Sequence, residues 1–159
     1  MTMHALHFPR IGGSIGPIDM LTAGRTLPYE FDFDSANGIL RCRLSGLVSD
    51  EVLQEFFDVG SQHARRTHPT AGVVDFSEVA ALEVSQETIR QIAKSVPAFS
   101  DPGLQRVVIA PTPHLYGMMR MFATQGEEIR PNLHVVHSEK EAWAILAVQD
   151  PQFKLLENN

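Results

Sequence analysis

The chain has 159 residues, of which 43% are hydrophobic and 20% charged, a balance typical of one globular domain with a single core. Its formal charge at pH 7 is −6, and its longest basic run is the pair Arg65-Arg66. This charge would repel a phosphate backbone, so the composition argues against a nucleic-acid partner. The N-terminal stretch has no continuous apolar run, so neither a signal peptide nor a membrane span is expected.

The first regular pattern begins after an irregular segment. Residues 1–27 contain scattered glycines and no sustained periodicity, which predicts an N-terminal arm. From Tyr29 to Asp34 aromatic residues alternate with acids, which predicts a half-buried strand. The turn-rich residues 34–38 and a second alternating run over 39–44 complete a predicted antiparallel hairpin. The domain is expected to span residues 28–149, with 150–159 as a C-terminal tail.

Cys42 is the only cysteine of the chain, so it can form no internal disulfide. It lies in the alternating pattern of the second predicted strand, where a small buried apolar residue fits. A reducing cytoplasm is therefore the expected compartment.

The first predicted helix follows the hairpin. Ser49 precedes two acids, which is typical of a helix N-terminus, and the apolar spacing after it predicts a helix to about Arg66. His63 and His68 flank the end of this helix and are expected to be solvent-exposed there.

Three short, β-branched runs follow, at residues 72–74, 106–110 and 133–136. Such runs are typical of parallel strands that are covered on both faces. Helical spacing predicts helices within 85–96 and 115–122 and a last helix after Ser138. The order β-β-α-β-α-β-α-β-α predicts an α/β fold with a mixed sheet of about five strands, an N-terminal antiparallel hairpin followed by parallel strands, and four helices.

Four segments carry a resemblance to a known family: GILRCRLSGLVSDEV (38–52), GVVDFSEVAALEVSQETI (72–89), RVVIAPTPHLYGMMRMF (106–122) and LHVVHSEKEAWAIL (133–146). In element order and motif placement they resemble the SpoIIAA-like branch of the STAS/SEC14-type domains, over roughly residues 28–148. The resemblance implies a small bacterial regulatory protein with no enzymatic activity and no cofactor.

Ser85 is the candidate regulatory residue. The anti-sigma-factor antagonists that this chain resembles are phosphorylated on a serine at the start of the second helix, after a strand that ends in Asp-Leu-Ser. Here Asp75-Phe76-Ser77 is expected to end a strand, and Glu83-Val84-Ser85-Gln86 follows, so the resemblance implies Ser85 as a phosphoacceptor. Ser85 also has the sequence context of an N-cap, which explains it without any switch.

Further residues are expected to form a ligand or partner surface. Open α/β sheets bind ligands at the carboxyl ends of their strands, and the polar residues expected at or near that edge are Asp75, Ser77, Glu83, Thr112 and His114. The segment 114–122 holds more apolar residues than one core face needs, so the residues expected to face a partner or ligand are Tyr116, Met118 and Met121.

Three functions follow from these residues. The first is a non-enzymatic regulatory module that binds an unknown protein partner or a second copy of itself as a homodimer. The alternative is a carrier or sensor of a small apolar, lipid-like ligand, and the third is a hydrolase that uses a Ser/His pair at the strand ends. No metal site is expected, because His134 and His137 would point to opposite faces of a strand with no carboxylate or cysteine at ligand spacing.

Overall fold

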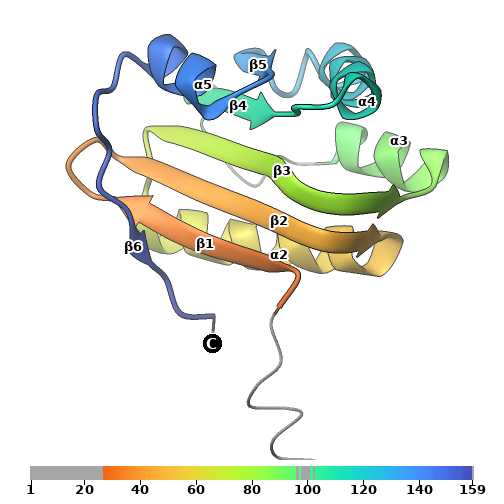
Figure 1. The fold of residues 1–159 in the computed structure, drawn as a ribbon, viewed down its shortest axis with the longest axis horizontal. Coiled ribbons are helices and arrows are strands. Elements are labelled where there is room, and N and C mark those ends of the chain that lie inside the picture. The colour runs from red at the N-terminus through yellow and green to blue at the C-terminus, as the bar shows by residue number, and fades with distance from the viewer. Residues whose placement is uncertain (1–26, 96, 98–100, 102, 159) are drawn as a thin grey trace, which may run out of the picture.

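The computed structural model describes residues 27–95, 97, 101 and 103–158 (Figure 1). The predicted N-terminal arm therefore lies outside the described residues, apart from Leu27. The elements follow one another as β1 (Tyr29–Asp34), β2 (Ile39–Ser49), α2 (Asp50–Thr67), β3 (Ala71–Glu83), α3 (Gln86–Lys94), β4 (Gln105–Ile109), α4 (Pro113–Gln125), β5 (Leu133–Val136), α5 (Glu139–Leu146) and β6 (Lys154–Leu155).

One mixed sheet organises these elements, with strand order β5-β4-β3-β2-β1-β6. The predicted hairpin is confirmed: β1 and β2 pair antiparallel, with Asp34 opposite Ile39. The pairs β2–β3, β3–β4 and β4–β5 are all parallel, as expected for strands joined by helical crossovers. The predicted fold class is confirmed, with six strands in place of about five, because β6 pairs with the outer edge of β1.

The hairpin turn shows why its residues fold as they do. Gly38 has φ +67°, a left-handed conformation that a glycine adopts without strain. The Asp34 carboxylate accepts hydrogen bonds from the backbone N–H groups of Ala36 (3.0 Å) and Asn37 (3.2 Å). It also accepts from the backbone of Gln152 (3.2 Å), which ties the C-terminal segment to the hairpin.

Helices cover the two faces of the sheet unequally. One face packs on α2, α3 and α4, around a core that includes Leu40, Phe56 and Val108. The other face packs on α5 over the β4 side, around Val107 and Ile109. Cys42 lies in the first core and exposes 2% of its surface, and burial raises the pKa of its thiol. The predicted role of Cys42 as a small buried residue is therefore confirmed.

One predicted strand end is wrong. β3 does not stop near Ser77 but continues to Glu83, because its second half pairs with the second half of β2 through bulges near Ser45 and Gly46. Its pairing with β4 ends at Asp75. Asp75 and Ser77 therefore lie inside a long strand and do not form its carboxyl end.

The exposure predicted for His63 is also wrong. His63 exposes only 3% of its surface, with its ring 4.9 Å from that of Phe31. Its Nε2 atom lies 2.7 Å from Oδ1 of Asn158. The C-terminal segment thus makes polar contacts with α2 as well as with the hairpin.

Candidate functional site

Ser85 begins α3 as its N-cap, as the sequence predicts. Its Oγ atom accepts a hydrogen bond from the Thr88 backbone N–H at 3.1 Å, and its own N–H donates to Oδ1 of Asp50 at 2.8 Å. This backbone hydrogen bond is the main reason why the pKa of Asp50 is lowered. The Ser85 side chain is exposed, so it is fixed by capping while remaining accessible from outside.

A groove runs between α3 and α4 next to Ser85. It has a volume of about 510 Å³. The residues that line it are Val84, Gln86, Ile89, Arg90, Pro113, His114, Gly117, Met118, Met121 and Gln125. Both chain neighbours of Ser85 are in this lining, so a group attached to Ser85 would stand at the edge of the groove.

The segment 114–122 divides its apolar residues between the core and the surface. Leu115, Met119 and Phe122 are buried, and Met118 is partly buried in the groove. Met121 exposes 59% of its surface, which is high for a large apolar side chain. Tyr116 is partly buried, and its ring stacks on that of His137 with centroids 4.0 Å apart.

Thr112, His114 and Glu83 border the same region. Thr112 is the N-cap of α4 and accepts from the Leu115 N–H at 3.3 Å. His114 is exposed in the first turn of α4, and Glu83 is the exposed last residue of β3. The structure thus brings Ser85, His114, Met118 and Met121 to one groove.

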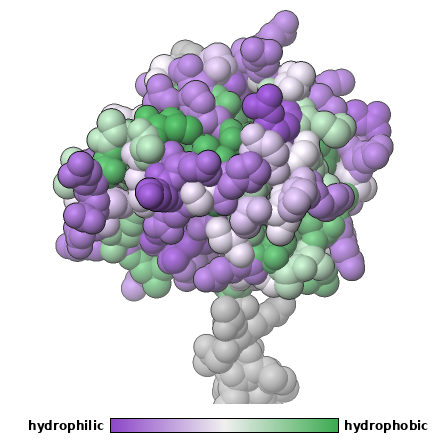
Figure 2. Space-filling model, turned by 45° about the horizontal axis from the view of Figure 1, so that its top comes forward, coloured by the Kyte–Doolittle hydropathy of each residue, from purple (hydrophilic) through white to green (hydrophobic). Residues whose placement is uncertain are grey.

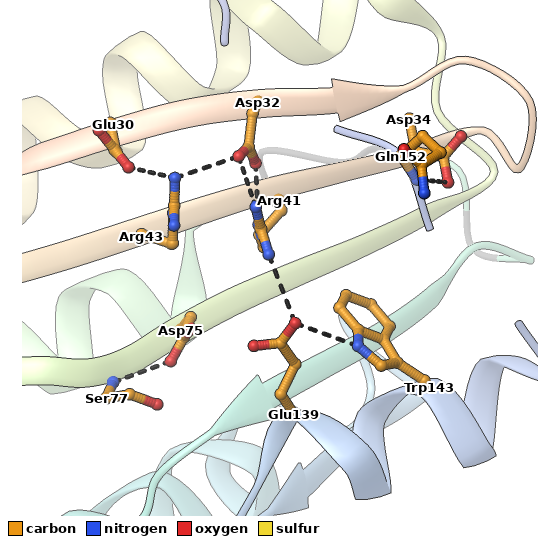
Figure 3. Close-up of polar contacts among 10 residues, drawn as sticks. All are labelled: Glu30, Asp32, Asp34, Arg41, Arg43, Asp75, Ser77, Glu139, Trp143 and Gln152. Atoms are coloured by element: carbon orange, nitrogen blue, oxygen red, sulfur yellow. Dashed lines mark hydrogen bonds and ion pairs between the residues drawn. The ribbon is translucent and has the colours of Figure 1, made fainter. Parts of the chain in front are cut away.

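Asp75 belongs to a different place. It is buried, accepts from the Ser77 N–H at 2.8 Å, and lies on the sheet face that carries Arg41 and is covered by α5, the helix that begins at Glu139 (Figure 3). The expectation that Asp75 and Ser77 share one ligand edge with His114 is wrong, because β3 runs past them and Asp75 points away from the helices α3 and α4.

Charged residues of β1 and β2 form a network on that face (Figure 3). Arg41 donates to both carboxylate oxygens of Asp32, at 2.9 and 2.6 Å, and Arg43 pairs with Asp32 and Glu30. Arg41 also lies 3.6 Å from Glu139. The charges of the network are thus paired with one another. The pairing follows from the register of the hairpin, which sets Glu30 and Asp32 of β1 opposite the two arginines of β2.

An apolar cavity of about 70 Å³ lies between the sheet and the helices α2, α3 and α4. Its lining includes Phe56, Val108, Ile92 and two buried arginines, Arg106 and Arg130. The Arg130 guanidinium donates to the carbonyls of Ala93 (2.8 Å) and Ile92 (3.0 Å) at the end of α3. Burial and, after it, the nearby charge of Arg106 lower the pKa of Arg130 to about 10. Sequence reasoning missed both arginines, because neither lies in a recognisable motif.

Three other features are absent from the described part of the chain. Among residues 27–95, 97, 101 and 103–158, no hydrogen bond joins a serine to a histidine side chain, as a Ser/His hydrolase would need. The same residues contain no group of three or more His, Cys, Asp or Glu that could hold a metal ion. No helix among them is long and apolar enough to cross a membrane.

The surface of the molecule carries both hydrophobic and hydrophilic patches. Figure 2 shows one face of the molecule, where hydrophobic areas lie in separate patches bordered by hydrophilic residues. The apolar surface in this view is thus divided into small areas, which is compatible with a short apolar groove.

Solved structures of other proteins are similar to this chain. No family model and no curated protein matches the sequence. Among solved structures, the anti-sigma factor antagonist SpoIIAA in its unphosphorylated form matches with a TM-score of 0.48 and 12% identity, over 71% of this chain and 93% of that chain. The Bacillus cell fate determinant SpoIIAA in the phosphorylated form matches with a TM-score of 0.43 and 15% identity, over 69% and 92%.

Proposed function

We propose that this protein is a STAS-like regulatory module that binds a partner protein in the groove between α3 and α4 and catalyses no reaction of its own. The observation that carries the proposal is the groove, in which Met118, Ile89 and the half-exposed Met121 line a hollow beside Ser85. Adaptable methionine side chains on a surface favour contact with another protein. The cytoplasm is the compartment that we propose, and the single buried thiol of Cys42 supports it.

Replacing Met121 by glutamate tests this function. A charge in the middle of an apolar contact must be desolvated, so Met121→Glu is expected to lower recovery of the partner at least about tenfold. The measurement is quantitative mass spectrometry of proteins that copurify with the tagged chain from its own host. The matched control is Leu155→Glu, because Leu155 is similarly exposed (65%) but lies on β6 at the far edge of the sheet.

The outcome of that comparison decides the proposal. A protein retained by wild type and Leu155→Glu but lost with Met121→Glu supports it, and an untagged copy of this chain in that role would identify a homodimer. If no protein distinguishes Met121→Glu from Leu155→Glu, the groove is not the partner surface.

Substitutions at Ser85 test the proposed regulation of the groove. Ser85→Ala removes the cap and is expected to cost about 1 kcal/mol of stability in urea unfolding, whereas Ser85→Asp keeps the cap and leaves stability nearly unchanged. The negative charge of Ser85→Asp would stand beside the groove-lining residues Val84 and Gln86 and close to Asp50, whose carboxylate accepts the N–H of residue 85. It is expected to weaken partner recovery more than Ser85→Ala does. Equal recovery with both variants would leave capping as the whole role of Ser85.

A second candidate function is the sensing of a small apolar ligand, and the cavity beneath α3 favours it. Ile89 lines both the cavity and the groove, so an occupant of the cavity would lie directly behind the partner surface. The volume of about 70 Å³ is below the roughly 300–1,000 Å³ of common ligand pockets, so the guest would have only a few heavy atoms. Native mass spectrometry of protein from its own host tests this: a retained small molecule supports the function, and a bare chain mass contradicts it.

A further inference from the structure

The charges around the groove indicate what kind of partner segment it fits. We infer that the groove between α3 and α4 binds an acidic, apolar segment of the partner protein, with carboxylates toward the start of α4 and toward Arg90 and Arg120, and with apolar side chains over the methionines. This inference rests on the proposed function and names the chemistry of its partner.

The first observation is the charge of the lining. A second hollow of about 350 Å³ adjoins the groove at Met121 and is lined by Arg120, Met121, Thr124 and Gln125. Across the two hollows the charged or ionisable lining residues are Arg90, Arg120 and His114, and no carboxylate is among the lining residues. This local excess of positive charge stands out in a chain with a formal charge of −6. Complementary charge favours a partner segment that carries carboxylates.

The second observation is the direction of the helices. Gln86 is the first residue of α3, and Pro113 and His114 are the first two residues of α4, and all three line the groove. Both helices therefore begin beside the groove, with the positive ends of their dipoles there, while α4 ends at its other end, at Gln125. The first turn of α4 contains no acidic residue of its own. A partner carboxylate would therefore be favoured at the start of α4, together with Arg90 of the facing helix.

Three carboxylates of the chain itself lie at the start of α3 and have to be weighed. Oδ1 of Asp50 already accepts the Ser85 N–H at 2.8 Å, and Glu83 is exposed two residues before Ser85, so this helix start is already supplied with acids. Glu87 pairs with Arg90 at 3.5 Å, and the two side chains are 65% and 53% exposed. Such an exposed pair is worth little, because water and salt screen it. Arg90 is thus available to a partner carboxylate that comes with additional apolar contact.

The apolar residues of the lining indicate that the partner segment must also contain apolar side chains. Val84, Ile89, Met118 and Met121 come from both walls and from the end of β3, so they can cover apolar side chains on one face of a docked peptide. A purely charged segment would leave these side chains in contact with water or with unpaired polar groups. The fit therefore requires both acidic and apolar residues.

Selection from a random library of 16-residue displayed peptides tests the inference on the full chain. The enriched sequences are expected to combine Asp or Glu with Leu, Ile, Met or aromatic residues. For a selected peptide, the double variant Arg90→Glu/Arg120→Glu is expected to raise Kd at least about tenfold, and added salt is expected to weaken binding to the wild type. Lys140→Glu is the matched control, because it reverses an exposed charge on α5, which packs on the other face of the sheet.

The outcomes separate the inference from the function on which it rests. The inference is overturned if the selected peptides are basic or neutral and their Kd is unchanged by Arg90→Glu/Arg120→Glu. If Met121→Glu still blocks their binding, the groove remains a partner site. Failure to enrich any peptide that Met121→Glu blocks counts against the groove itself and so against both. Circular dichroism of each variant confirms that a change in Kd does not come from unfolding.

Discussion

Phe31→Ala is expected to lower the free energy of unfolding by about 3–5 kcal/mol, the range for removing a large aromatic side chain from a core. Phe31 is fully buried, and its ring stacks on that of Phe56 with centroids 5.4 Å apart and an interplanar angle of 17°. Its ring also lies 3.3 Å from where a side chain on Gly60 of α2 would begin, so β1 and α2 approach closely here. The loss leaves a cavity that the sheet and helix cannot close.

Urea unfolding at pH 7 measures this effect. Leu155→Ala is the control, because Leu155 is 65% exposed and its truncation should change stability by less than about 0.5 kcal/mol. A loss below about 1 kcal/mol for Phe31→Ala would mean that the contact between β1 and α2 is not part of the stable core.

Asp34→Ala is expected to cost roughly 3 kcal/mol, because it leaves donors in the hairpin and the C-terminal segment without their acceptor. The fully buried carboxylate accepts from the backbone of Ala36, Asn37 and Gln152 and from Nδ2 of Asn37 at 2.6 Å. Two segments more than a hundred residues apart thus depend on one side chain.

The same carboxylate predicts a pH dependence. Burial alone would raise the pKa of Asp34, but the hydrogen bonds from Asn37, Gln152 and Ala36 outweigh it and lower the pKa below its usual value. The charged form is therefore stabilised by folding, so its contribution is present above the unfolded pKa of about 4 and is lost as pH falls through the lower folded pKa. Urea unfolding of wild type and Asp34→Asn at pH 7 and pH 3 measures this. The stability gap is expected to shrink at pH 3, and a gap that stays constant or widens would contradict the assignment.

Local patterns predicted much of this fold correctly. The alternation around Tyr29 and Phe31 predicted β1, and the side chains of Ser49 and Ser85 begin α2 and α3 as capping residues. These signals lie within a few residues of each other in sequence, so no tertiary contact is needed to read them.

The errors arise where distant contacts decide the structure. The second half of β3 contains Ser77, Glu78 and two alanines, which have no strand pattern, and it is extended because β2 pairs with it. β6 has only two residues and is a strand solely through its pairing with β1. His63 is buried because Phe31 and Asn158, far away in the sequence, meet it.

In the candidate site too, local sequence signals were predicted correctly and features that depend on distant contacts were not. Ser85 and Met121 were found because a cap and an excess of apolar residues can be read locally, whereas the groove between them depends on how α3 and α4 pack together. Asp75 was assigned to the wrong surface, because the prediction ended β3 too early. The positions of Arg90 and Arg120 along adjoining hollows likewise depend on how α3 and α4 pack together.

Photo-crosslinking from position 121 tests the partner groove most directly. A benzophenone amino acid at Met121, expressed in the native host and irradiated in living cells, is expected to capture one defined protein through a segment rich in acidic and apolar residues. The same probe at Leu155 should not capture it, and Ser85→Asp should lower its yield at position 121. Identical crosslinked proteins from positions 121 and 155, or no specific product from position 121, would contradict the proposal that this groove is where the protein binds its partner.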